Sequence, residues 1–142
     1  MEREITSEFE MRKLGQTIGQ QLHGGEVVEL VGDVGAGKTT LTKGIAVGLG
    51  VDEAVQSPSF TISRTYQTAQ PGIVLAHYDF YRLTDPGIMA DELSEVTNDT
   101  DVVTIVEWAE IVNDILPEGH IRIAIVATDE STRRVSVEGV IL

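Results

Sequence analysis

The sequence predicts an α/β protein with a P-loop NTPase-like layered fold, a mainly parallel central sheet and antiparallel additions at the C-terminal end. Strand-like and helix-like segments alternate through the first two thirds of the chain, which is typical of helices packed on a parallel sheet. A glycine-rich segment lies between one of these strands and the helix that follows it. Two strand-like segments follow each other directly near the C-terminus, which indicates an antiparallel addition to the sheet.

The N-terminal third is predicted to contain a helix, a strand and a second helix. Ser7 and Glu10 have the spacing of a capping box and precede apolar residues at helical intervals, which predicts a first helix over residues 7–22. The short apolar segment 27–31 predicts a buried strand. Residues 39–49 predict a second helix, because a glycine that can end it follows directly.

The rest of the chain is predicted to add five strands and two helices. Segments rich in β-branched and aromatic residues predict strands over residues 60–67, 73–78, 102–106, 121–127 and 134–140. One helix is expected to begin with Thr84 as its cap and to run through Glu92 or beyond, and a shorter one to end at Leu116. The last strand alternates apolar and polar residues, and we interpret it as an edge strand.

Length and composition indicate one ordinary globular domain. The chain has 142 residues, so we expect a single domain over residues 1–142. It has no cysteine, which excludes disulfides and thiolate metal sites. No apolar segment approaches the roughly 20 residues of a membrane helix, and no secretory signal is visible. We therefore expect no membrane association and a cytoplasmic location.

The charge balance disfavours a broad nucleic-acid-binding surface. The net charge is −13, from 23 acidic and 10 basic residues. Binding to a nucleic-acid backbone needs clustered lysines and arginines, whereas basic residues are adjacent here only at positions 12–13 and 133–134. If the protein serves a nucleic-acid pathway, we therefore expect it to act through a protein partner. The alternative interpretation of the negative charge is that it only aids solubility.

Residues 32–39, Gly-Asp-Val-Gly-Ala-Gly-Lys-Thr, form a complete Walker A motif. Its glycines let the backbone approach phosphates closely, and the loop amides form an anion-binding nest. The helix that follows presents the positive end of its dipole to the same phosphates. Lys38 is expected to reach the β- and γ-phosphates, and the hydroxyl of Thr39 to bind magnesium. The motif therefore predicts binding of ATP with Mg²⁺.

Two acidic residues end predicted strands and are candidates for the second half of the site. Asp79 follows the strand 73–78, and Glu107 follows the strand 102–106. A P-loop ATPase needs a carboxylate at such a strand end to hold magnesium directly or through water. Glu107 has the cleaner Walker B context, an apolar run and then one carboxylate. One of the two would ligate magnesium while the other polarises the attacking water.

Two neighbouring side chains have competing interpretations. Trp108 is the only tryptophan and follows Glu107, so it lies either beside the site or in the core. His77 has an apolar setting, and we interpret it as a satisfied core histidine rather than a ligand.

Four segments together resemble the bacterial TsaE family. They are the Walker motif extended to Thr40, the segment Ser57, Pro58, Ser59, Phe60 and Thr61, the segment His-Tyr-Asp-Phe-Tyr-Arg-Leu at 77–83, and Glu107 with Trp108. The order and spacing match over nearly the whole chain, and the last two segments are the more diagnostic. The resemblance implies a small ATPase required for threonylcarbamoyladenosine formation in tRNA. It implies action with the TsaD and TsaB proteins, which carry the transfer chemistry, and contact with tRNA only through that complex.

The resemblance also implies roles for individual residues. Phosphate contacts would come from Gly35, Ala36, Gly37, Lys38, Thr39 and Thr40. Thr39 and Glu107 would hold magnesium, with Asp79 supporting the metal or the water. Trp108 would line the nucleotide site or the partner surface.

Two further segments receive roles in the same way. The adenine would lie near Thr6 or Ser7 and near Arg133 or Arg134. The segment from Ser57 to Thr61 would act as a switch loop that senses the γ-phosphate. The family usually has threonine at its third position, where this chain has Ser59, which keeps the hydroxyl.

Other functions remain open at this point. A small-molecule P-loop kinase usually supplies several arginines from a lid, whereas only Arg64 and Arg82 lie in the middle of this chain. A GTPase is disfavoured because no Asn-Lys-x-Asp segment is present. A nucleotide-dependent assembly factor with negligible hydrolysis would have the same sequence features as a slow ATPase, so the sequence does not separate the two. No arginine finger is recognisable, so we expect weak ATP hydrolysis that partners stimulate.

Overall fold

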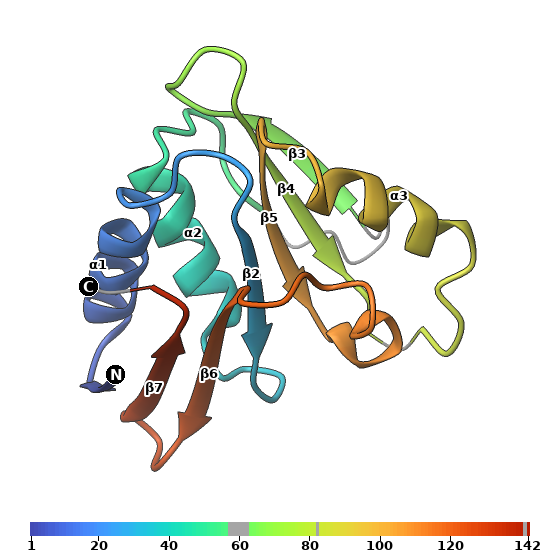
Figure 1. Ribbon diagram of the computed structural model, residues 1–142. Coiled ribbons are helices and arrows are strands. Elements are labelled where there is room, and N and C mark those ends of the chain that lie inside the picture. Colours follow the sequence, from blue (N-terminus) through green and yellow to red (C-terminus); the bar gives the residue numbers. More distant parts are fainter. Residues whose placement is uncertain (57–62, 82, 141) are drawn as a thin grey trace.

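The computed structural model describes residues 1–56, 63–81, 83–140 and 142 (Figure 1). Its strands are β1 (Glu2–Ile5), β2 (Val27–Val31), β3 (Ser63–Gln67), β4 (Val74–Asp79), β5 (Val102–Glu107), β6 (Ile121–Ala127) and β7 (Arg133–Glu138). Its helices are α1 (Glu8–Gly19), α2 (Lys38–Gly48), α3 (Ile88–Thr97) and the short 3₁₀ helix η1 (Ala109–Val112).

The strands form one mixed sheet in the order β1-β7-β6-β2-β5-β4-β3. The four central strands β6, β2, β5 and β4 are parallel to one another. At one edge β7 runs antiparallel to β6, and β1 pairs antiparallel with β7. This arrangement confirms the predicted α/β class with an antiparallel C-terminal addition. The other edge also ends in an antiparallel strand, because β3 forms a hairpin with β4.

Helices cover both faces of this sheet (Figure 1). On one face α1 and α2 pack on alternate strand residues, among them Leu30, Ile105 and Ile123, all fully buried. On the other face α3 and η1 cover the β4 and β5 side, where Leu93 and Val112 are also fully buried. Because strand side chains alternate between faces, each central strand contributes to a separate apolar core on each side.

The crossing of α1 and α2 depends on glycines from both helices. Gly15 and Gly19 of α1 lie against Gly44 and Gly48 of α2, so that backbone meets backbone. A Cβ atom at any of the four would overlap a main-chain oxygen of the other helix. This close contact holds the N-terminal turn of α1 next to the start of α2, where the Walker motif lies.

The first helix is capped as the sequence predicts. Ser7 is the N-cap residue of α1, and its hydroxyl accepts a hydrogen bond of 3.1 Å from the amide of Glu10. The helix is shorter than predicted, because it ends at Gly19 rather than at residue 22.

Two other helix predictions were wrong in their bounds. The third helix does not begin at Thr84, because the carboxylate of Asp85 accepts a hydrogen bond from the amide of Gly87. That bond closes a turn, and α3 begins only at Ile88. The short helix expected to end at Leu116 is a single 3₁₀ turn that ends at Val112.

The prediction that the last strand lies at the sheet edge was also wrong. The strand β1 pairs with β7 and forms that edge. Sequence reasoning missed β1 because its residues Glu2, Arg3 and Glu4 are exposed and only Ile5 is buried. A strand with a single buried side chain carries little apolar pattern.

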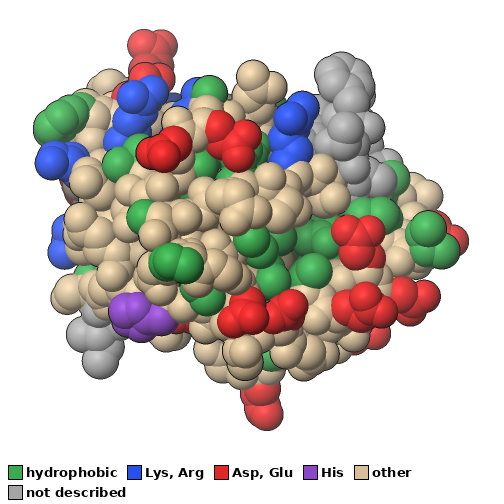
Figure 2. All heavy atoms as spheres, turned by 90° about the horizontal axis from the view of Figure 1, so that it is seen from above, with side chains coloured by type: hydrophobic (Ala, Val, Ile, Leu, Met, Phe, Trp, Pro, Cys, Tyr) green, Lys and Arg blue, Asp and Glu red, His purple; other side chains and the backbone are tan. Residues whose placement is uncertain are grey.

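Two surface properties complete the description. Among the described residues, no helix combines the length and the apolar character needed to cross a bilayer. On the face seen in Figure 2, the Lys and Arg side chains lie in separate groups, with Asp and Glu side chains between and beside them. The basic side chains therefore do not merge into one surface on that face.

Candidate functional site

The Walker motif links the end of β2 to the start of α2, at the carboxyl edge of the parallel strands where α/β proteins bind ligands. Gly35 and Gly37 have φ angles of 82° and 115°, which side chains with a Cβ atom rarely adopt. Gly37 occupies the N-cap position of α2, and among the described residues no side chain caps the helix there. The positive end of the helix dipole therefore faces the loop, which suits an anion.

Lys38 is held at the mouth of this loop by two contacts. Its ammonium group donates a hydrogen bond to the carbonyl oxygen of Gly32, within the same loop. The same nitrogen lies 3.9 Å from the centroid of the Trp108 ring, a cation–π contact. The lysine is only 7% exposed, so its charge is kept beside the Walker loop rather than in solvent.

Asp79 and Glu107 meet at the ends of neighbouring strands. They are register partners across the parallel strands β4 and β5, as their positions in the sequence suggested. Glu107 is buried, and Asp79 accepts a hydrogen bond of 2.9 Å from the amide of Tyr81. Partial burial raises the pKa of Asp79 above its usual value, and the nearby charge of Glu107 raises it further. A cation between the two carboxylates would offset both effects.

His77 joins this pair, which the sequence did not predict. Its Nε2 atom lies 2.6 Å from Oε2 of Glu107, and the side chains are 1% and 5% exposed. The burial expected of His77 is confirmed, and within the described part of the chain its Nδ1 atom has no hydrogen-bond partner. The signal available in the sequence is the spacing, since His77 and Asp79 are two residues apart and share one face of β4.

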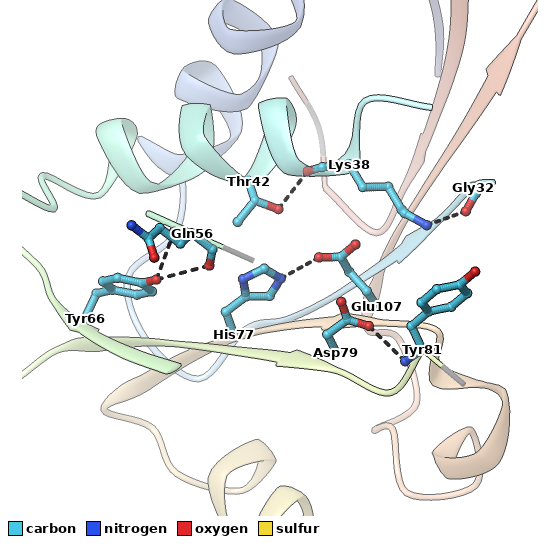
Figure 3. Close-up of polar contacts among 9 residues, drawn as sticks. All are labelled: Gly32, Lys38, Thr42, Gln56, Tyr66, His77, Asp79, Tyr81 and Glu107. Carbon is cyan, nitrogen blue, oxygen red and sulfur yellow. Dashed lines mark hydrogen bonds and ion pairs between the residues drawn. The ribbon is translucent and has the colours of Figure 1, made fainter. Parts of the chain in front are cut away.

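Figure 3 shows how these side chains lie. His77, Asp79 and Glu107 point toward the helix that carries Lys38 and Thr42, from two strands on the opposite side of the site. Alternation along β4 and β5 explains this direction, because all three share the face of the buried residues of the α1 and α2 core.

Trp108 lies beside the site rather than deep in the core. Among the described non-glycine residues it alone has a positive φ, 56°, which turns the chain sharply after β5. Its ring covers Lys38 and packs against Tyr81, with ring centroids 4.8 Å apart. Tyr81 was not singled out from the sequence, and it closes the aromatic cover over the lysine.

A pocket of about 480 Å³ opens on the other side of the Walker loop. Its lining combines the loop and helix start with the turn before α1 and the β6–β7 connection: Gly35, Ala36, Gly37, Lys38, Thr39, Thr40, Thr6, Ser7, Glu130, Ser131 and Arg133, together with Ile5, Glu8 and Met11. Arg133 reaches the loop directly, because its Nε donates a hydrogen bond of 3.1 Å to the carbonyl oxygen of Ala36.

Arg134 is the one adenine candidate that does not line this pocket. Its Nε atom lies 3.9 Å from Oε1 of Glu2, in an exposed contact with the neighbouring strand. Successive residues of a strand point to opposite faces, so Arg133 and Arg134 cannot both face the Walker loop.

Comparison with known proteins identifies the family of this chain. The family model of the threonylcarbamoyl adenosine biosynthesis protein TsaE matches residues 5–135. This chain belongs to the TsaE family.

Relatives from several bacteria agree with this assignment. The TsaE protein of Streptomyces coelicolor is 40% identical over 136 residues, which are 91% of this chain and 90% of that protein. The TsaE protein of Bacillus subtilis is 38% identical over 118 residues, which are 82% of this chain and 71% of that protein. The crystal structure of Bacillus subtilis YdiB superposes with a TM-score of 0.78 at 30% identity and covers 96% of this chain and 83% of that one. The P-loop fold and the family resemblance predicted from the sequence are thereby confirmed.

One TsaE segment cannot be placed within this site. The expected switch loop, Ser57, Pro58, Ser59, Phe60 and Thr61, lies outside the described residues, as does Arg82.

Among the described residues of this TsaE protein, no three His, Cys, Asp or Glu side chains are grouped so that they could hold a metal ion by themselves. The oxygen atoms of Asp79, Glu107 and Thr39 are nevertheless the ligand type that Mg²⁺ prefers. Magnesium usually completes its shell with water and substrate phosphates, so this donor set fits a metal that arrives with a nucleotide.

Proposed function

We propose that this TsaE-family protein binds ATP together with Mg²⁺ and hydrolyses it slowly, in support of threonylcarbamoyladenosine formation in tRNA. The observation that carries the proposal is the cross-strand pair of Asp79 and Glu107 beside Lys38. A Walker loop alone only binds phosphate, whereas hydrolysis also needs carboxylates that hold magnesium or orient water.

The triphosphate is expected to lie on the amides of residues 35–40, at the positive end of α2. Lys38 would exchange the carbonyl oxygen of Gly32 for β- and γ-phosphate oxygens, since charged acceptors form the stronger hydrogen bonds. The adenosine would extend into the adjacent pocket between Ser7 and Arg133, whose volume is typical of small-molecule sites. Arg134 is left out of this proposal because it does not line the pocket.

The two carboxylates would have different roles in hydrolysis. We assign Thr39 and Glu107 to hold magnesium, which neutralises charge on the phosphates when it is bound. Asp79 would support the metal or orient the water for attack on the γ-phosphate. The neighbouring aromatic rings of Tyr81 and Trp108 would limit access of bulk water to this end of the nucleotide.

Family membership supports action with TsaD and TsaB, the partners that the resemblance implies. The net charge of −13 supports contact with tRNA only through that complex, because direct binding to a phosphate backbone needs a basic surface.

The proposal is tested by steady-state ATP turnover, measured with the purified protein alone and with added TsaD and TsaB. We expect slow turnover alone and clear stimulation by the pair. Equal turnover in both conditions would remove the partner from the proposal. Magnesium-dependent ATP binding without measurable turnover in either condition would favour a nucleotide-dependent assembly factor.

Lys38→Ala provides the first test of the site itself. Loss of the ammonium group should lower turnover at least about 100-fold, the usual effect of removing one preorganised charged donor. Lys43→Ala is the matched control, because Lys43 lies on the same helix but is exposed. If Lys38→Ala hydrolyses ATP as fast as Lys43→Ala, the assignment of Lys38 to the phosphate site is contradicted.

A further inference from the structure

We propose that His77 is a positioning residue for Glu107 and that its Nε2–H group holds the carboxylate in the orientation needed for magnesium-dependent ATP binding and hydrolysis. This inference rests on the proposed function and adds to it a residue outside the Walker motifs. It starts from the contact of 2.6 Å between Nε2 of His77 and Oε2 of Glu107.

The chemistry of the two groups gives the contact a direction. A glutamate that holds a cation does so as a carboxylate, which can only accept hydrogen bonds, so we assign the proton of this contact to Nε2 of His77. The neutral Nε2–H tautomer is sufficient for this bond. The contact of 2.6 Å is short for an N–H···O bond, and bonds to a charged acceptor are shorter than bonds between neutral groups. The bond uses one lone pair of Oε2, so the carboxylate keeps further lone pairs for a cation or a water.

Strand geometry explains why His77 can reach this position. Asp79 and Glu107 are register partners, and His77 lies two residues before Asp79 on the same face of β4. Its ring therefore approaches Glu107 diagonally, from the side away from Lys38 (Figure 3).

The surroundings of His77 argue against a purely structural role. Its Nδ1 atom is buried and has no hydrogen-bond partner within the described ranges of the chain, which is unfavourable for folding. The neighbouring core position on the same face of β4 is Leu75, which is fully buried. An apolar side chain at position 77 would fill the space without burying such a nitrogen, so the bond to Glu107 is what the histidine contributes.

A second histidine supplies a matched comparison. Nε2 of His120 lies 2.9 Å from Oε1 of Glu29, whose side chain takes the opposite face of β2 from the buried residues of the α1 and α2 core. The two pairs have similar chemistry, but only the His77 pair includes a residue that we assign to magnesium. Breaking each pair separately therefore distinguishes the general effect of losing a histidine–glutamate bond from the specific effect of losing the positioning of Glu107.

The test compares His77→Leu, His77→Gln and His77→Asn with His120→Leu. For each variant, ATP binding is titrated by calorimetry without magnesium and at increasing Mg²⁺ concentrations, and turnover and the melting temperature are measured alongside. The amide nitrogen of glutamine falls near the position of Nε2, whereas that of asparagine falls near Nδ1. Glutamine should therefore restore the bond, and asparagine should not.

We expect His77→Leu to raise the Mg²⁺ concentration for half-maximal ATP binding, or to lower turnover, by about 10- to 100-fold, as loss of an outer partner usually does. Metal-free ATP binding should stay within about 2-fold of wild type, since the change does not touch the Walker loop. His77→Gln should recover most of the loss, and His120→Leu should match wild type in both measurements.

Three results would overturn the proposal in different ways. A folded His77→Leu protein with wild-type magnesium dependence and turnover would refute the role of His77 alone. Equal behaviour of His77→Gln and His77→Asn would refute it even if His77→Leu does not fold. A wild-type protein without magnesium-dependent ATP binding would overturn the proposed function and this inference together.

Discussion

Two histidine–glutamate pairs lie on opposite faces of one sheet and have different surroundings. The pair of His77 and Glu107 is almost completely buried, and the pair of His120 and Glu29 is 20% and 12% exposed. Both ring nitrogens of His120 have partners, because Nδ1 lies 2.9 Å from the carbonyl oxygen of Pro117. Arg122 adds a further contact of 3.8 Å to Glu29.

The difference between the pairs separates a structural contact from a candidate functional one. His120, Glu29 and Arg122 are partnered at partly exposed positions, which is the usual arrangement in native proteins. Near His77, a buried nitrogen lacks a partner within the described residues, and a second carboxylate, Asp79, lies in register with Glu107. Burial and unbalanced charge therefore mark the site more clearly than the bond itself does.

The largest difference between the two pairs is expected in ATP turnover when each glutamate is replaced. Glu107→Gln should lower turnover by about 100-fold or more with a smaller change in ATP affinity, because a metal or water role matters most in the transition state. Glu29→Gln, on the opposite face, should leave turnover unchanged. Single-turnover hydrolysis and ATP titrations check both, and wild-type hydrolysis by Glu107→Gln would refute its assignment.

The next effect concerns the pH dependence of stability at Asp79. Because the folded-state pKa of this carboxyl is raised, the folded protein binds the proton more tightly than the unfolded chain does. The ionised carboxylate therefore costs stability, and that cost develops as the pH rises from the unfolded pKa of about 3.9 through the folded value.

Asp79→Asn should accordingly raise the melting temperature at pH 7 by a few degrees or less, and the gain should shrink as the pH approaches 4. The measurement is thermal unfolding without nucleotide or metal, where no cation offsets the charge. Turnover of the same variant should fall. A larger gain at pH 4 than at pH 7 would show that the charge of Asp79 is not the cause.

The smallest effect is expected at the partly exposed pair. His120→Leu should change the free energy of unfolding by about 1 kcal/mol or less, since polar contacts at partly exposed positions contribute little to stability. Denaturant unfolding at neutral pH measures it. A loss of several kcal/mol would mean that this pair stabilises the fold, and the contrast with His77 would then lie only in function.

The elements that the sequence predicted well are those with short-range causes. The Walker loop and the cap of α1 depend on residues within a few positions of one another, so their conformations follow from local chemistry. The positions of Asp79 and Glu107 at strand ends follow from apolar runs that stop at an acid. Parallel strands then bring such ends to the same edge of the sheet.

The elements that it predicted poorly depend on distant partners. The edge strand β1 was missed because its pairing with β7 joins the two ends of the chain through backbone bonds. The start of α3 was misplaced because an aspartate turn competes with the helix for the same amide.

The sequence by itself determined the phosphate loop and the two acidic strand ends, because each is encoded in contiguous residues. It also determined the fold class and the family, through the order and spacing of separate segments. Only the tertiary structure decided that Arg133 rather than Arg134 borders the pocket, that Trp108 covers Lys38 and that His77 bonds to Glu107. These three depend on which face a side chain takes and on strand register across 30 or more residues. Register is set by packing of the whole sheet, so no local pattern contains it.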